Sequence, residues 1–117
     1  MNLRVLVTGA NGFVGRFLCP LLLDAGHQVV AAIRRDAAPE LPAAVECVNI
    51  GELTQSTHWR DALNSIDAII HLAARTHVME ETEPNHELAY RRINVDATRR
   101  LANEAAEHDV RRMVFLS

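Results

Sequence analysis

Short apolar runs alternate along the chain with longer segments in which apolar residues recur at helical spacing. The runs favour strands because they are nearly unbroken, and the spaced segments favour helices. Gly26, directly after the first spaced segment, is typical of a residue that ends a helix. We therefore expect strands at 3–8, 28–33, 45–48, 67–72 and 113–116, and helices at 12–25, 58–65 and 85–107.

The alternation of strands and helices predicts an α/β fold with a Rossmann-type, doubly wound parallel sheet. Strands that are mostly apolar, without regular polar alternation, are typical of a sheet that helices cover on both faces. We expect the strand order 3-2-1-4-5 with right-handed crossovers, and such sheets bind ligands at the carboxyl ends of the strands where the order reverses. Here that place lies between the first and fourth strands of a single domain, residues 1–117.

The turn after the first strand, TGANGFVG at residues 8–15, carries three glycines at a spacing of three. Gly9 permits a tight turn, Gly12 lets backbone N–H groups approach a diphosphate, and Gly15 lets the helix pack close to the sheet. Asn11 either adopts left-handed backbone angles or caps the helix. Placed between a strand and a helix, the pattern predicts a dinucleotide site rather than a turn that serves packing alone.

The residues at the end of the second strand favour NADP over NAD. Ile33 stands where an NAD site commonly has an acidic residue for the ribose 2′-hydroxyl. Arg34 and Arg35 follow, and guanidinium groups suit a 2′-phosphate because their donors match its oxygen atoms. In the alternative reading both arginines are solvated and Asp36 accepts from a ribose hydroxyl, which suits NAD.

The composition excludes several classes of function. The formal net charge is -3, and all 12 basic residues are arginine. A chain without a basic field is a poor partner for nucleic acid or an anionic membrane, and one without lysine cannot by itself supply a Schiff-base or Walker A lysine. No apolar run approaches the roughly 20 residues that cross a bilayer. Cys19 and Cys47, without a CxxC pair, predict two buried thiols in a reducing, cytoplasmic setting.

The six histidines do not form a metal-binding pattern, because none pairs with another at helical i, i+4 spacing or with cysteine at finger spacing. No metal site is expected. His71, near the end of the fourth predicted strand, is interpreted as a histidine at the edge of the core whose ring packs near the cofactor.

Four segments together resemble one known family: TGANGFVG at 8–15, HLAAR at 71–75, INVDAT at 93–98 and RRMVFLS at 111–117. The resemblance is to the extended short-chain dehydrogenase/reductase family of nucleotide-sugar epimerases and dehydratases. HLAARTHVM followed by RRMVFLS is most similar to bacterial 4-epimerases and 4-ketoreductases of surface-polysaccharide biosynthesis. The resemblance implies a homodimeric parent enzyme that uses NADP or NAD and transfers hydride at the C4 atom of a nucleotide sugar, in particular a UDP-sugar.

The resemblance also assigns residues to the cofactor. Glu52 departs from the aspartate that is usual beside the adenine, and Asn94 matches an asparagine near the nicotinamide half. The implied residues are Gly9, Gly12, Phe13, Val14 and Gly15 at the diphosphate, Glu52 and Leu53 at the adenine, and Leu72, Ala73, Ala74 and Arg75 in the loop over the cofactor.

The chemistry of the family needs a serine after the fifth strand and a Tyr-x-x-x-Lys pair, in which lysine lowers the pKa of the tyrosine. Ser117 matches the first of two family serines, and the catalytic serine would be the next residue. Tyr90 is followed four residues later by Asn94 rather than lysine, so we assign no catalytic residue. We expect the cofactor domain of a longer enzyme, inactive by itself; a non-enzymatic NAD(P)-sensing module is the alternative.

Overall fold

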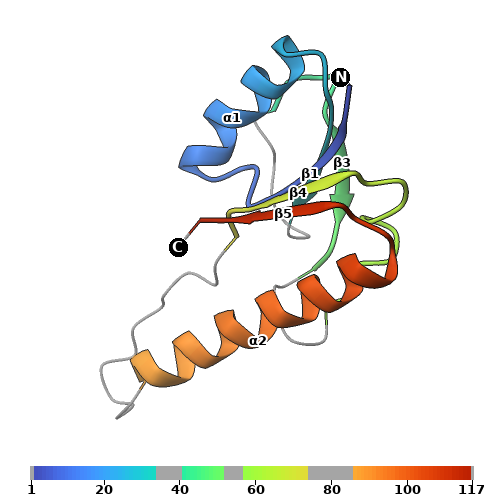
Figure 1. The fold of residues 1–117 in the computed structure, drawn as a ribbon. Coiled ribbons are helices and arrows are strands. Elements are labelled where there is room, and N and C mark those ends of the chain that lie inside the picture. Colours follow the sequence, from blue (N-terminus) through green and yellow to red (C-terminus); the bar gives the residue numbers. More distant parts are fainter. Residues whose placement is uncertain (1, 34–40, 52–56, 74–85, 117) are drawn as a thin grey trace.

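The computed structural model describes residues 2–33, 41–51, 57–73 and 86–116, which contain one five-stranded parallel sheet (Figure 1). Its order is β3-β2-β1-β4-β5, so the predicted Rossmann-type topology is confirmed. Each strand begins and ends within one residue of its predicted bounds: β1 (Arg4–Thr8), β2 (Gln28–Ile33), β3 (Glu46–Asn49), β4 (Ala68–His71) and β5 (Arg112–Phe115).

Two helices lie on opposite faces of the sheet (Figure 1). Helix α1 (Phe13–Asp24) connects β1 to β2, and α2 (His86–Glu107) precedes β5, both close to their predicted positions. Over the residues that the structure describes, neither helix is both long and apolar enough to cross a membrane.

The prediction of a short helix at 58–65 is wrong, because the chain forms a series of turns there. The Leu63 N–H donates to the Trp59 carbonyl at 2.9 Å, which closes one helical turn. Ser65 then adopts a φ of 58°, and a residue in the left-handed region ends the right-handed winding. The helical spacing of the apolar residues serves burial instead, since Trp59, Ala62, Leu63 and Ile66 are all buried.

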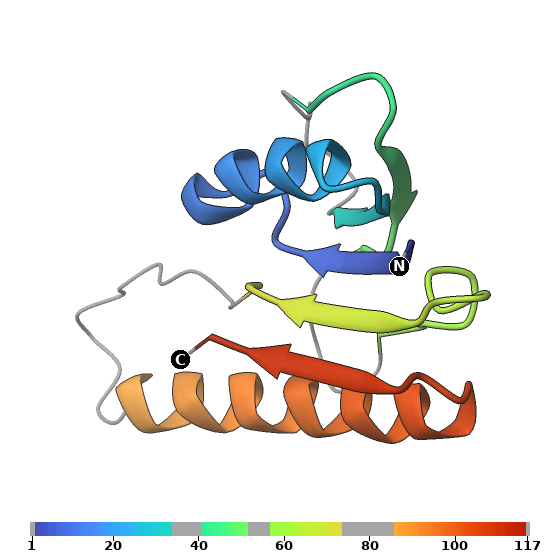
Figure 2. The ribbon, with the colours of Figure 1, turned by 45° about the horizontal axis from the view of Figure 1, so that its top comes forward.

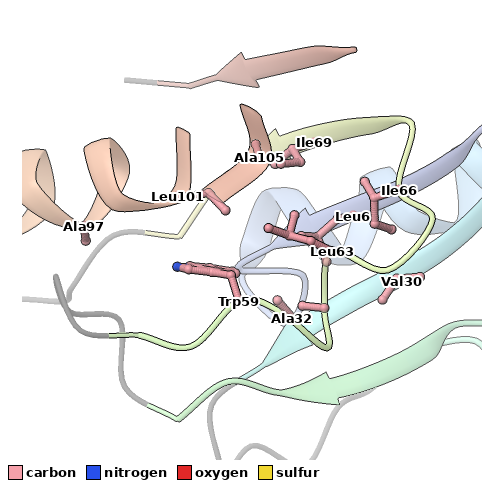
Figure 3. Packing of buried hydrophobic residues seen from close by; sticks show 11 residues of the cluster. Leu6, Val30, Ala32, Trp59, Leu63, Ile66, Ile69, Ala97, Leu101 and Ala105 are labelled. Carbon is pink, nitrogen blue, oxygen red and sulfur yellow. The ribbon is translucent and has the colours of Figure 1, made fainter. Parts of the chain in front are cut away.

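Each face of the sheet has its own core, because successive strand residues point to opposite faces. Leu6 of β1 packs with Trp59 and Leu101 on the side of α2 (Figure 3). Val7, the next residue, belongs to the core on the side of α1, together with Cys19. Burial on both faces explains why the strands read as unbroken apolar runs.

The two cysteines differ in exposure, which corrects the prediction of two buried thiols. Cys19 in α1 is buried, and its burial raises the pKa of the thiol. Cys47 in β3 is exposed. β3 is an edge strand with three exposed residues out of four, so an apolar run at this position does not imply burial.

Candidate functional site

The candidate site lies at the edge of the sheet where β1 and β4 end side by side. Thr8, the last residue of β1, pairs in register with His71, the last residue of β4. The chain leaves both strands at this edge, from β1 into the glycine turn and α1, and from β4 into residues 72–73 (Figure 2). The strand order reverses here, which is the position at which sheets of this class bind ligands.

Two glycines of the turn are required by the packing of the chain itself. Gly9 has a φ of 65°, and a Cβ on it would lie 2.8 Å from the backbone nitrogen of Ala73. A Cβ on Gly15 would lie 2.5 Å from the Cα of Ala10. Both distances are far below van der Waals contact, so side chains at these positions are excluded. The turn is therefore packed on one side against residues 72–73, which follow β4 and are called the β4 connection below, and on the other side against α1.

Gly12 differs from the other two glycines because the fold constrains it less. Its φ of -79° and ψ of -178° are extended angles that any residue adopts. A Cβ there would approach a single group, the carbonyl oxygen of Gly9 at 3.2 Å, and otherwise meet open space. Gly12 is the N-cap of α1 and is itself exposed, with no side-chain hydrogen bond at the cap and no acidic residue in the first turn. The amino end of α1 thus presents backbone N–H groups to the outside, as an anion site does.

Asn11 plays neither of its two predicted roles. The turn takes its positive φ at Gly9, and Asn11 is not among the described residues with left-handed angles. The N-cap falls on Gly12, one residue later, and no side chain caps the helix. Asn11 stays in the turn as an exposed residue beside Gly12.

A buried hydrogen-bond network lies directly beneath the glycine turn. The Thr8 Oγ1 atom is 2.6 Å from His71 Nδ1 and accepts hydrogen bonds from the backbone N–H groups of Leu72 at 3.0 Å and Ala73 at 3.1 Å. His71 Nε2 lies 3.2 Å from Thr98 Oγ1 on α2. Burial lowers the pKa of His71 to about 4, so the ring is neutral at neutral pH. The exposed fraction of His71 is 1%, so the burial predicted for this histidine at the end of β4 is confirmed, and the packing of its ring near a cofactor stays a prediction.

A family model described as the NAD dependent epimerase/dehydratase family matches residues 5–117, which include the whole candidate site. The chain belongs to this family. The resemblance to nucleotide-sugar epimerases and dehydratases is thereby confirmed at the level of the family.

Relatives of the chain differ in the substrates for which they are named. UDP-glucose 4-epimerase from Vibrio cholerae is 32% identical over 118 residues, covering 100% of this chain and 35% of the relative. 3 beta-hydroxysteroid dehydrogenase/Delta 5→4-isomerase from Mycobacterium tuberculosis is 36% identical over 118 residues, covering 97% of this chain and 31% of the relative. The solved structure of MoeE5 in complex with UDP-glucose and NAD is 36% identical, with a TM-score of 0.73 over 96% of this chain and 35% of that one. The chain spans about a third of the length of each of these proteins.

The structure brings many of the cofactor residues predicted for this family to one edge of the sheet. The backbone of Gly9 lies against Leu72 and Ala73, and the first residues of α1, Phe13 and Val14, are exposed beside the turn. Asn94 lies in the amino-terminal half of α2, which starts at the same edge on the other face (Figure 2). The predicted residues Arg34, Arg35, Glu52, Leu53, Ala74 and Arg75 lie outside the part of the chain that the structure describes.

Sequence analysis missed two members of the buried network in this epimerase/dehydratase domain, Thr8 and Thr98. A polar residue at the end of an otherwise apolar strand was the available signal for Thr8. The predicted strand order places the ends of β1 and β4 together, so the pairing of Thr8 with His71 was also within reach. Thr98 gave no such signal, because the register of α2 on the sheet is set by packing that the sequence pattern does not reveal.

Proposed function

We propose that the chain forms the dinucleotide-binding part of an enzyme that transfers hydride at the C4 atom of a nucleotide sugar, with a UDP-sugar as the substrate class. The observation that carries the proposal is Gly12 at the uncapped amino end of α1. Gly9 and Gly15 serve the packing of the chain, whereas Gly12 borders open space. A diphosphate needs that space, because its oxygen atoms must approach backbone N–H groups without a Cβ between them.

Relatives that are named for UDP-sugars, or were solved with them, support the substrate class. The Vibrio cholerae relative is a UDP-glucose 4-epimerase, and MoeE5 was solved with UDP-glucose and with UDP-glucuronic acid, in each case with NAD. The Mycobacterium tuberculosis relative is named for a hydroxysteroid, so family membership alone does not choose the substrate. We choose the nucleotide sugar because HLAARTHVM and RRMVFLS resemble that branch of the family.

The residues of this chain have binding and positioning roles in the proposed reaction. The dinucleotide, when bound, supplies the nicotinamide that accepts and returns hydride. The N–H groups at the start of α1 hold its diphosphate, and residues 72–73 border the turn that presents them. None of the 117 residues is lysine, so the Tyr-x-x-x-Lys proton shuttle of the family is not among them. We therefore expect this chain alone to bind dinucleotide without converting a nucleotide sugar.

NADP is proposed as the preferred cofactor on the strength of Arg34 and Arg35, which follow β2 directly. Arg34→Ala should weaken NADP binding by about tenfold, the equivalent of one charge-assisted hydrogen bond, and leave NAD binding unchanged. Calorimetric titration of both dinucleotides measures the difference. An equal loss of affinity for NAD and NADP would contradict this role for Arg34. Polysaccharide biosynthesis, a homodimeric parent and a cytoplasmic setting stay predictions.

Backbone amide shift mapping tests the proposed site. Titration of the labelled chain with NAD or NADP should move the amide signals of residues 9–15 and 72–73 most. Gly12→Ala should weaken dinucleotide binding about tenfold or more, because its Cβ enters the space that the diphosphate needs.

Gly26→Ala is the matched control for that variant. Gly26 follows α1 and precedes β2, at the opposite edge of the sheet, with a φ of 92°. The substitution should lower the free energy of unfolding by about 1–2 kcal/mol and leave dinucleotide affinity unchanged. The proposal fails if a saturating dinucleotide moves no signal in residues 9–15 of the folded chain, or if Gly12→Ala binds as tightly as the unaltered chain.

A further inference from the structure

The Thr8 hydroxyl group has three partners within hydrogen-bond distance. The backbone N–H groups of Leu72 and Ala73 donate to its oxygen at 3.0 and 3.1 Å. His71 Nδ1 lies 2.6 Å away. All three partners belong to the last residue of β4 and the two residues that follow it, so one side chain of β1 contacts each of them. The Leu72 N–H is also 3.3 Å from the main-chain carbonyl oxygen of Thr8, so Ala73 is the residue that depends on the side chain alone.

Counting protons in this group fixes the tautomer of His71. A hydroxyl oxygen has one proton to donate and two lone pairs with which to accept. The N–H groups of Leu72 and Ala73 occupy both lone pairs, so the Thr8 proton is donated to His71 Nδ1. The neutral ring therefore carries its own proton on Nε2, which donates to Thr98 Oγ1 at 3.2 Å. The low pKa of the buried ring, about 4, is consistent with a neutral imidazole.

The two N–H groups that Thr8 accepts are the ones that place the β4 connection against the glycine turn. A Cβ on Gly9 would lie 2.8 Å from the nitrogen of Ala73 and 3.0 Å from the carbonyl carbon of Leu72. Thr8 directly precedes Gly9, so the network begins one residue from the turn. If the Thr8 Oγ1 atom rotated away, the Ala73 N–H would lose its hydrogen bond to Thr8, and the Leu72 N–H would keep only the longer contact with the Thr8 carbonyl oxygen at 3.3 Å.

We propose that His71 is a positioning residue for the dinucleotide site. By accepting the Thr8 hydroxyl proton at Nδ1, it keeps both Thr8 lone pairs directed at Leu72 and Ala73 and so holds the β4 connection against the glycine turn. The proposal rests on the proposed function in one respect, because this placement matters for a dinucleotide only if the glycine turn binds its diphosphate.

The first test needs no variant, because nitrogen NMR distinguishes the two ring nitrogens of the unaltered chain. At neutral pH, Nδ1 of His71 should show the shift of an unprotonated nitrogen and Nε2 that of a protonated one. The opposite tautomer would overturn the proposal, since Nδ1–H would then compete with Leu72 and Ala73 for the same oxygen atom.

Two variants separate the acceptor at Nδ1 from the bulk of the ring. His71→Phe keeps an aromatic ring against Phe115, whose centroid is 5.7 Å away, but removes the acceptor. His71→Asn places a side-chain carbonyl near the position of Nδ1 and restores an acceptor for Thr8. With one hydrogen bond at stake, His71→Phe should weaken NAD or NADP binding about tenfold and His71→Asn by less than about threefold. The proposal is overturned if His71→Asn loses as much dinucleotide affinity as His71→Phe. It is also overturned if His71→Phe folds and binds dinucleotide as tightly as the unaltered chain.

His108→Phe is a matched control for the same chemical change. His108 follows α2, and its Nδ1 makes a 2.8 Å contact with the carbonyl of Glu104 rather than with any residue of the candidate site. The variant should keep the dinucleotide affinity of the unaltered chain, whatever it costs in stability. An equal loss of affinity in His108→Phe and His71→Phe would show a general effect of instability and overturn the positioning role.

Amide hydrogen exchange without any dinucleotide separates this proposal from the proposed function. The Ala73 amide should exchange about tenfold faster in His71→Phe than in the unaltered chain and return toward the original rate in His71→Asn. The Leu72 amide should change less, because it keeps its contact with the Thr8 carbonyl oxygen. Unchanged exchange in His71→Phe would overturn the positioning role even if dinucleotide binds. Faster exchange in a chain that does not bind dinucleotide would instead leave the positioning role supported and the proposed function wrong.

Discussion

His71 is a titratable side chain at a position where a positive charge is costly. Its exposed fraction is 1%, and burial lowers its pKa from 6.5 to about 4. Protonation would also turn Nδ1 into a donor facing Thr8 Oγ1, whose lone pairs already accept from Leu72 and Ala73. A charged ring therefore breaks hydrogen bonds as well as losing hydration, and both effects act on the connection that borders the glycine turn.

Acid should destabilise the fold through this residue. The unfolded chain takes up a proton on the imidazole near pH 6.5, and the folded chain does so only near pH 4, so the free energy of unfolding falls as the pH drops through that window. A pKa difference of this size corresponds to a loss of about 3 kcal/mol. Urea unfolding from neutral pH down to 4 measures the loss. His71→Asn lacks the titrating ring, and the prediction is wrong if its unfolding free energy follows the same pH dependence as that of the unaltered chain.

Helix α1 meets the sheet through backbone rather than through side chains at its first turn. A Cβ on Gly15 would lie 2.6 Å from the carbonyl oxygens of both Gly9 and Ala10. Backbone atoms cannot rotate away as a flexible side chain can, so a methyl group here would push α1 from β1. Gly12, three residues earlier, is less constrained, because a Cβ there would meet one backbone atom only, the carbonyl oxygen of Gly9 at 3.2 Å. Alanine at Gly15 should therefore lower the free energy of unfolding, whereas alanine at Gly12 should lower the affinity for dinucleotide.

Gly15→Ala should lower the free energy of unfolding by about 1–3 kcal/mol, because overpacking outweighs the better helix propensity of alanine. Gly12→Ala should change it by less than about 1 kcal/mol and act on dinucleotide affinity instead. Urea unfolding of both variants, beside the unaltered chain, makes the comparison. A larger loss of stability in Gly12→Ala than in Gly15→Ala would contradict the close contact between Gly15 and the backbone of residues 9–10.

The sequence pattern predicted the strands and both helices because each of these depends on local burial, and it predicted the strand order because alternating strands and helices favour a doubly wound sheet. Residues 29–33 form an unbroken apolar run because β2 lies between two strands and its faces contribute to two cores. The glycine turn was predictable for a similar reason: Gly9 and Gly15 stand where the backbone excludes any side chain. Burial and close backbone packing restrict the residue type at a single position, so they can be recognised in one sequence.

The remaining features depend on groups that are distant in the sequence. The helical spacing at 58–65 was real, but Ser65 ends the winding after a single turn while Trp59 and Leu63 still reach the core. Asn11 is one residue away from the N-cap, which was one of its two predicted roles. The contact between His71 and Thr98 joins a strand to a helix 27 residues away, and only three-dimensional packing sets that register.

At the scale of the whole molecule, apolar side chains gather outside the two cores on one face. Phe13, Phe17 and Leu21 of α1 are 74%, 66% and 63% exposed and lie one helical turn apart. Val114 of β5 is 56% exposed and pairs with Ile70, which belongs to the core on the α1 side. Within the described residues, α1 covers β1 and β2 but not β5 on this face (Figure 2). Clustered apolar exposure of this kind is typical of a surface that associates with another.

The isolated chain should therefore self-associate, and Phe17→Gln should weaken the association about tenfold or more, since burying a phenylalanine is worth about 1.5–3 kcal/mol. Sedimentation velocity over a wide range of concentrations measures this. Val95→Gln, which removes an exposed apolar residue from α2 on the opposite side, should have no effect. The prediction is wrong if the unaltered chain sediments as a monomer throughout, or if the two variants behave alike.

Trp59 is the single tryptophan of the chain and is fully buried in the core between the sheet and α2 (Figure 3). Tryptophan fluorescence therefore reports on the core between the sheet and α2, and it does not report on the core between the sheet and α1. Loosening of α2 would shift the emission to longer wavelength, whereas detachment of α1 would leave it nearly unchanged. Paired with circular dichroism, which sees both helices, this one fluorophore can reveal whether the two layers melt together or in sequence.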